Sequence, residues 1–353
     1  MFEPPSVSVI VVNFRTPEYA IQCVQSLVPE RVAVPNLEVV LIDNASGDDS
    51  VSIMSDALAD LISDGFVKLM PLEINGGFGW ANNQALLLLL ARARPPEFVM
   101  LLNPDCTIEP GAVRVLLDEL SLNDKCAVAG SQLLNPDGSW TGSAFRFPSI
   151  GREFVRGAGI DMVGRLLGIA PTLIASDSSC DADWVTGASC LIRTNALDIE
   201  GLFDDGFFLY FEEVELMFRL RQAGWTIRHV PGSRVFHIGG ASTGLREGKT
   251  LSAPSFPLYW FQSRRRFLTL AYGPLRAWVA NIAWIVGVSL GWIRGTFTSS
   301  KAAPTNIADT RQLFNHGLWP SGTDGKSAIA RAGDSIGRPP AWMRPESNEP
   351  HAG

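Results

Sequence analysis

The stretch SVSVIVVNF, residues 6–14, is a continuous apolar run that closes on polar residues. Runs of this kind are typical of strands that are buried on both faces, as in parallel sheets. The stretch LEVVLIDNA (37–45) repeats the pattern, and the residues between the two predict a helix from about Pro17 to Leu27. This order of strand, helix and strand predicts an α/β fold with a mainly parallel sheet and helices on both faces.

The alternation of strand and helix patterns continues to about residue 135 and then loosens. Gly, Ser, Pro and Asp interrupt residues 135–183, where we expect loops. Order returns with a strand and a short turn over 183–197, a helix from Glu212 to about Gly224, and an extended segment over 226–240. The other predicted strands cover 67–73, 98–105 and 126–134, and the other predicted helices cover 48–62, 80–94 and a segment that starts near Pro110.

The composition excludes several classes of protein. Of 353 residues, 46% are hydrophobic, which excludes a disordered chain. The net charge is −7, so we expect no nucleic-acid partner, because such binding needs a basic surface. Five scattered cysteines without a CxxC pair indicate neither a disulfide framework nor a cysteine zinc site, and reduced thiols suit a cytoplasmic protein. The N-terminus lacks the basic region of a cleaved signal peptide.

Polar residues follow the first two predicted strands. Asn13 comes after the first strand, and Asp43 and Asn44 come after the second. Ligands of open parallel sheets bind beyond the carboxyl ends of the strands, where a carboxylate can accept hydrogen bonds from a base or a ribose. The run DNASGDD also consists of turn formers, so an ordinary turn is the alternative. The residues alone leave both interpretations open.

The tripeptide Asn103-Pro104-Asp105 ends the predicted strand over 98–105. A carboxylate at this point can hold Mg²⁺ or Mn²⁺ against a diphosphate, since both ions prefer oxygen ligands. A plain turn is the alternative, because a similar tripeptide recurs at 135–137. His237, in RVFHIGG, is either a structural hydrogen-bonding residue or a metal ligand.

Two adjacent carboxylates, Glu212 and Glu213, open a predicted helix directly after the apolar stretch FFLYF. The helix dipole lowers the pKa of a carboxylate there, whereas an apolar surrounding raises it toward that of a useful general base. The sequence does not decide which effect wins. Gly76, Gly77 and Gly79 precede another helix, whose N-terminus can receive phosphate. The chain has no GxGxxG after its first strand, no Walker A motif and no GxSxG motif, so dehydrogenases, P-loop enzymes and α/β-hydrolases are not supported.

In their order along the chain, these motifs resemble the inverting family 2 glycosyltransferases of the GT-A fold. Within that family the chain is most similar to the rhamnosyltransferase-type enzymes of bacterial surface-polysaccharide assembly. The resemblance implies a GT-A domain over 1–245, with a nucleotide-binding half over 1–135 and an acceptor half over 136–245. It is carried by SVIVVNF, LEVVLIDNASGDDS, NGGFGWANNQA, FVMLLNPD, WVTGASCLIR, GLFDDGFFLYFEEVELMFRLRQAGW and VFHIGG.

The resemblance also implies roles for single residues. Asp105 matches the second aspartate of the family's metal-binding motif, and His237 matches the histidine that completes the metal shell. Glu213 matches the catalytic base, where the family often has Asp, and Glu212 is the alternative base. The residues expected to contact the nucleotide sugar are Asn13, Asp43, Asn44, Gly77, Asn103, Asp105 and Gly187.

The function that the resemblance implies is a single displacement with inversion. A nucleoside-diphosphate sugar would be the donor, Mg²⁺ or Mn²⁺ the cofactor, and a hydroxyl of a glycan or polyprenyl-linked molecule the acceptor. A sugar-1-phosphate nucleotidyltransferase is an alternative, although its triphosphate loop needs more Gly and Arg than NFRTPEYA offers. A non-catalytic protein that binds sugar nucleotides is a second alternative.

The C-terminal third differs in composition. Residues 246–295 combine basic residues with an uncharged run over 277–293, which as a helix would be about 25 Å long against a hydrocarbon core of about 30 Å. Tryptophans along this run favour peripheral membrane contact, while a core helix and a spanning helix are alternatives. We expect a protein at the inner face of the cell membrane. Residues 296–353, rich in Gly, Pro and Ser, predict a disordered tail.

Overall fold

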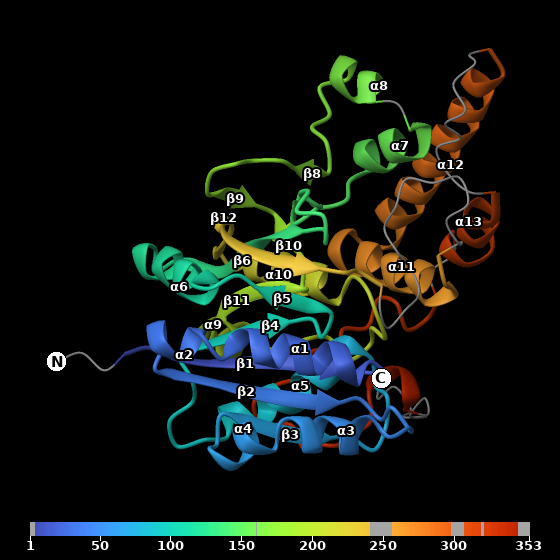
Figure 1. Cartoon of the computed structure of the whole chain (residues 1–353). Coiled ribbons are helices and arrows are strands. Elements are labelled where there is room, and N and C mark those ends of the chain that lie inside the picture. Colours follow the sequence, from blue (N-terminus) through green and yellow to red (C-terminus); the bar gives the residue numbers. More distant parts are fainter. Residues whose placement is uncertain (1–3, 160, 241–255, 298–306, 319–320, 345–353) are drawn as a thin grey trace.

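A nine-stranded sheet forms the centre of this computed structural model, within the residues that it describes: 4–159, 161–240, 256–297, 307–318 and 321–344 (Figure 1). The strand order is β3-β2-β1-β4-β11-β6-β12-β5, and β9 pairs with β12. The strands are β1 (Ser6–Asn13), β2 (Asn36–Asp43), β3 (Val67–Pro71), β4 (Phe98–Leu102), β5 (Cys106–Ile108), β6 (Cys126–Leu134), β9 (Cys180–Ala182), β11 (Ser189–Arg193) and β12 (Thr226–His237). A second sheet joins β10 (Trp184–Val185), β7 (Ala144–Phe145) and β8 (Leu173–Ile174).

The strands of the first half run in parallel, so their carboxyl ends share one edge of the sheet. β1 pairs in parallel with β2 and with β4, and the register sets Asn13 opposite Asp43. β11 runs antiparallel between β4 and β6, and β12 returns parallel to β6. Because β5 pairs antiparallel with the end of β12, Cys106 lies opposite His237.

Helices cover both faces of the sheet. Alternate residues of β1 point to opposite sides, so Val9 and Val11 pack with the α1 side of the core, whereas Ile10 packs with Trp80 on the α5 side. This two-sided burial explains the uninterrupted apolar runs in the sequence. The helices are α1 (Pro17–Leu27), α2 (Glu30–Ala33), α3 (Ser50–Ala57), α4 (Ala59–Ser63), α5 (Phe78–Leu90), α6 (Ala112–Leu122), α7 (Ile150–Ala158), α8 (Asp161–Leu166), α9 (Thr194–Glu200), α10 (Glu212–Gln222), α11 (Leu258–Tyr272), α12 (Pro274–Phe297), α13 (Ile307–Gln312), the π-helix η1 (Leu313–Gly317) and the 3₁₀ helix η2 (Ala341–Met343).

The prediction of a disordered tail over 296–353 is wrong for residues 307–318 and 321–344. Leu202 N donates to the carbonyl of Ala330 at 2.9 Å, and Trp80 Nε1 donates to the carbonyl of Arg338 at 2.8 Å. This segment contains few large apolar side chains, so its composition resembles that of a disordered chain. Its order comes from backbone hydrogen bonds and ion pairs with the first 240 residues and α11, which composition does not reveal.

The uncharged run over 277–293 lies inside α12, which is 24 residues long. Among the described residues, α12 is the one helix that is long and apolar enough to cross a membrane, and 39% of its apolar window is buried. It packs against α7 and α11, and Figure 1 shows α7, α8, α11, α12 and α13 gathered at one end of the molecule.

Candidate active site

The ends of β1 and β2 are joined by a buried polar network. Asn13 Nδ2 donates to Asp43 Oδ1 at 2.9 Å, and Ser46 donates to both carboxylate oxygens, from Oγ to Oδ1 at 2.6 Å and from N to Oδ2 at 2.9 Å. The two loops that leave this network contain non-glycine residues with positive φ, Arg15 at 57° and Ala45 at 55°. Backbone strain of this kind persists only where the surroundings enforce it, and it is concentrated at functional sites. Asp43 therefore shapes both loops at the sheet edge.

Asn44 ties this edge to the glycine turn before α5. Its Nδ2 donates to Asn75 Oδ1 at 2.9 Å, while its Oδ1 is buried and has no hydrogen-bond partner among the described residues. Gly77 has a φ of 90°, and a Cβ there would lie 1.9 Å from the carbonyl oxygen of Phe208. The turn therefore requires glycine, and Phe78 N donates to that same carbonyl at 3.1 Å.

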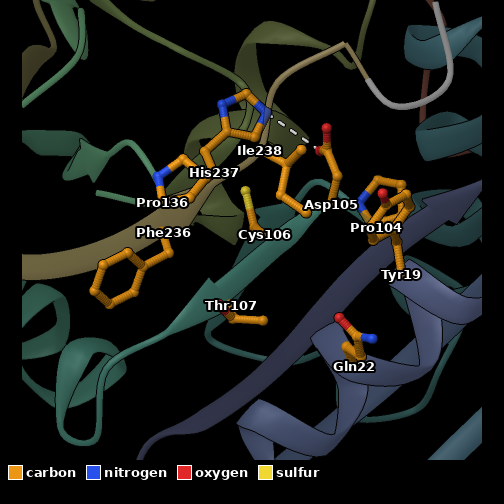
Figure 2. A pocket seen from close by; sticks show the side chains of 10 residues that line it. All are labelled: Tyr19, Gln22, Pro104, Asp105, Cys106, Thr107, Pro136, Phe236, His237 and Ile238. Atoms are coloured by element: carbon orange, nitrogen blue, oxygen red, sulfur yellow. Dashed lines mark ion pairs between the residues drawn. The ribbon is translucent and has the colours of Figure 1, made fainter. Parts of the chain in front are cut away.

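Asp105 and His237 meet across the antiparallel pair of β5 and β12. His237 Nε2 lies 3.2 Å from Asp105 Oδ1, and the carboxylate is largely buried. Both residues line a pocket of about 250 Å³ whose opposite wall is formed by Tyr19 and Gln22 of α1 (Figure 2). The remaining lining residues are Pro104, Cys106, Thr107, Pro136, Phe236 and Ile238.

The donor set of this pocket fits a divalent cation. A carboxylate oxygen of Asp105, Nε2 or Nδ1 of His237 and Sγ of Cys106 lie within 4.8 Å of one another. Burial raises the pKa of the Cys106 thiol well above its ordinary value, so the thiol is protonated and is a poor ligand. One carboxylate and one imidazole remain, which suits an ion that takes its other ligands from a diphosphate and water, such as Mn²⁺ or Mg²⁺.

Glu212 and Glu213 begin α10, but their side chains have different surroundings. Glu212 is 2% exposed and packs against Gly79, where a Cβ would lie 3.3 Å from its Cβ and Cγ. Burial, and next the charge of Glu213, raise the pKa of Glu212 well above its ordinary value. Glu213 is half-buried and lies beside Gly187, with 3.6 Å between its Cβ and the position of a Cβ on that glycine.

The backbone before these two residues is strained. Tyr210 and Phe211 have φ values of 69° and 68°, which bulky residues rarely adopt. The phenyl ring of Phe211 packs on Trp260 of α11, at 5.5 Å between ring centroids. A strained turn fixed by aromatic packing therefore sets the direction in which α10 begins.

The loop Gly187–Ala188 brings the separate parts of the site together. Asn103 N donates to the carbonyl of Ala188 at 2.9 Å, which places the end of β4 next to this loop. Gly187 itself contacts Phe78, from the glycine turn, and lies next to Glu213. Phe78, Glu213, Asn103 and Cys106 thus lie around one loop, and Cys106 is next to Asp105 in the chain. Asn13 and Asp43 lie at the ends of β1 and β2, and Asn44 connects that edge of the sheet to the turn at Gly77.

Sequence reasoning missed three contributors to the site. Ser46 binds Asp43 from the expected turn, and its position three residues after an Asp was the available signal. Phe78 lies against Gly187, and Tyr19 lines the pocket from α1. No local pattern separates Phe78 or Tyr19 from ordinary helix residues, because only the tertiary fold brings them to the site.

Several known proteins resemble this chain. Residues 8–159 match the family model described as Glycosyl transferase family 2. The chain is 30% identical over 241 residues, which are 65% of this chain and 75% of the relative, to the N-acetylglucosaminyl-diphospho-decaprenol L-rhamnosyltransferase of Mycobacterium tuberculosis. It is 26% identical over 168 residues, 46% of this chain and 60% of the relative, to the rhamnosyltransferase WbbL of Escherichia coli.

A solved structure shows the same fold. The mannosyltransferase PcManGT from Pyrobaculum calidifontis, in complex with GDP-Man and Mn²⁺, aligns with a TM-score of 0.55 at 14% identity. The alignment covers 90% of this chain and 88% of the other. The predicted α/β architecture of the GT-A type, with a mainly parallel sheet flanked by helices, is therefore confirmed.

Proposed function

This chain belongs to glycosyl transferase family 2, and on that premise we propose that it transfers a rhamnosyl unit or a closely related sugar from a nucleoside-diphosphate donor to a polyprenyl-linked glycan. The sugar and the acceptor are suggested by two relatives named rhamnosyltransferases, one of which is named for a decaprenol-linked substrate. The observation that carries the proposal is the convergence of Glu213 and the Asp105–His237 pair on the loop Gly187–Ala188. An enzyme that acts on a polyprenyl-linked acceptor would be located at the inner face of the cell membrane.

The donor is proposed to bind along the sheet edge, with its nucleotide near Asn13 and Asp43. The buried Oδ1 of Asn44 can accept a hydrogen bond from a hydroxyl or amide group of the nucleotide sugar. The diphosphate lies toward Asp105 and His237, with Asn103 and Gly77 beside it. A divalent cation held by Asp105 and His237 would neutralise the diphosphate and stabilise the leaving group.

Glu213 is the proposed catalytic base. Glu212 is less suited to that role, because burial and the charge of Glu213 raise its pKa and so disfavour the carboxylate form that accepts a proton. The same shift favours a single negative charge on the pair, carried by Glu213. Glu213 then takes the proton of the acceptor hydroxyl, which attacks the anomeric carbon from the face opposite the diphosphate, so the configuration inverts in one displacement.

The test is a panel of nucleoside-diphosphate sugars, each with and without Mn²⁺, incubated with a short-chain polyprenyl-diphosphate glycan. We expect release of nucleoside diphosphate that depends on the acceptor, and a product whose anomeric configuration, read by NMR, is opposite to that of the donor. Pyrophosphate release from a nucleoside triphosphate and a sugar phosphate would instead identify a nucleotidyltransferase. Donor binding with no turnover across the panel would identify a non-catalytic protein.

A further inference from the structure

One face of α12 carries exposed apolar side chains. Leu275, Trp278, Val286, Leu290 and Ile293 are each between 37% and 73% exposed. At 3.6 residues per turn they fall within about one third of the helix circumference. From the first to the last of them the helix extends about 27 Å, so this apolar face of α12 is a continuous stripe rather than a set of scattered side chains.

Other exposed apolar side chains lie in the same helical group. Leu166 and Leu167, at the end of α8, are 79% and 59% exposed. Trp292 and Phe314 line a groove of about 570 Å³ together with Thr310 and Arg311. These residues belong to the helical group at one end of the molecule, which Figure 1 shows in the upper right. Exposed apolar surface that gathers in this way marks an interaction site.

The charges around this face have one sign. Arg165, Arg276 and Arg311 are exposed, while the acidic residues among the described side chains of α7, α8, α11, α12 and α13 are buried. Glu153 is paired with Arg264, and Asp309 accepts a hydrogen bond from Phe256 N. The whole chain carries a net charge of −7, whereas the exposed charged side chains described in these helices are positive. An anionic lipid surface is complementary to such a face.

The opposite face of α12 is firmly attached to the protein. Trp284 is 2% exposed, and a Cβ at Gly157 of α7 would lie 2.2 Å from its carbonyl oxygen. A Cβ at Gly287 would lie 2.2 Å from the carbonyl oxygen of Phe154, so the two helices pack backbone against backbone. Beneath α12, Arg264 is buried in an ion pair. Because α7 and the buried Arg264–Glu153 ion pair cover this side of α12, lipid cannot surround the helix, and only its exposed face is accessible to a membrane.

We propose that the apolar face of α12, extended by η1, docks on a bilayer leaflet that contains anionic lipid, with α12 parallel to the membrane plane. Exposed arginines contact the lipid phosphates, and the apolar side chains enter the boundary between headgroups and acyl chains. The protein is then a peripheral membrane protein. Peripheral contact is one of the three arrangements that the sequence left open, beside a core helix and a spanning helix.

A chain of aromatic contacts joins α12 to the residues just before the proposed base. Phe211, which precedes Glu212 and Glu213, packs on Trp260 at 5.5 Å, and Trp260 packs on Trp284 of α12 at 5.9 Å between ring centroids. A membrane bound at α12 therefore has a defined position relative to the first turn of α10. The idea that the docked protein receives a lipid-linked acceptor rests on the proposed function. Membrane binding itself is inferred only from the exposed apolar and basic residues.

Vesicle co-sedimentation of the full chain, without donor or acceptor, tests the inference. We expect binding to phosphatidylcholine vesicles that contain phosphatidylglycerol, weaker binding to pure phosphatidylcholine, and partial release at about 1 M salt, where charges are screened within about 3 Å. The double substitution V286D/L290D should lower the partition coefficient by at least about tenfold, because two apolar side chains lose their burial.

The matched control is V32D/L122D, which changes the same residue types at positions that are 88% and 85% exposed on α2 and α6. It should bind vesicles like the unchanged protein. Brominated lipids should quench tryptophan fluorescence, and W278F/W292F should remove most of that quenching. Equal loss in both double variants, no binding of the unchanged protein to anionic vesicles, or resistance of the vesicle-bound protein to alkaline carbonate extraction would overturn the inference. The turnover assay does not enter this test, so failure here leaves the proposed function standing.

Discussion

Replacement of Gly77 by alanine tests the link between the glycine turn and the loop before α10. The backbone of Gly77, with φ 90° and ψ 177°, is a conformation that is costly for other residues, by about 1–3 kcal/mol. The new Cβ would also lie 1.9 Å from the Phe208 carbonyl oxygen, which accepts the hydrogen bond from Phe78 N. If the turn moves away, that bond is lost at about 1 kcal/mol. The expected decrease in the free energy of unfolding is therefore about 2–4 kcal/mol.

The measurement is chemical denaturation together with donor affinity by calorimetry. Gly138→Ala is the control, since Gly138 has a φ of 80° but a Cβ there meets nothing within 4 Å. It should cost only the conformational strain of about 1–2 kcal/mol and leave donor affinity unchanged. Gly77→Ala should weaken donor binding at least about tenfold, equal to 1.4 kcal/mol. Equal donor affinity in the two variants would refute the idea that contact with residue 208 shapes the donor site.

Three further predictions concern single side chains. The pKa of Glu212 is raised above its unfolded value of 4.5, so the folded state holds the proton more tightly and stability falls as pH rises above that value. Glu212→Gln should therefore be more stable than the unchanged protein at pH 8, by about 1.4 kcal/mol per unit of raised pKa, and should lose this advantage near pH 4 in urea titrations. His237→Ala should weaken Mn²⁺ binding in the presence of a nucleoside diphosphate at least about tenfold by electron paramagnetic resonance, and unchanged affinity would exclude His237 as a ligand. Asp204→Asn should lower the free energy of unfolding by about 3–5 kcal/mol, because this carboxylate is buried, pairs with Arg266 at 2.7 Å and accepts from Ala328 N at 2.8 Å; a loss below 1 kcal/mol would show that it does not hold the C-terminal segment.

The first half of the fold follows from the sequence, because strands buried on both faces leave long apolar runs. In the structure Asn13 and Asp43 lie opposite each other, because β1 and β2 are parallel neighbours that end at one edge of the sheet. Helix continuity was harder to predict: the single helix expected over 48–62 is divided at Leu58 into α3 and α4. The strand β5 is only three residues long, which is too short for a recognisable sequence pattern. It forms because these residues pair with β12.

The sequence indicates candidate site residues, but it does not separate the roles of the two adjacent glutamates. Glu212 and Glu213 are chemically equal in the sequence, and only the packing of Gly79 against one and Gly187 beside the other tells them apart. The C-terminal segment was not predictable for a related reason. Its order depends on partners such as Asp204 that lie more than a hundred residues away.

The measurement that tests the central claim most directly compares Glu213→Gln with Glu212→Gln in donor binding and in turnover. Both variants should bind the nucleotide sugar with unchanged affinity. Glu213→Gln should lose turnover by at least about a hundredfold, as expected for removal of a general base, whereas Glu212→Gln, at a carboxyl whose raised pKa favours the neutral form, should retain most of it. Full activity of Glu213→Gln, or loss of turnover in Glu212→Gln alone, would contradict the assignment of the base.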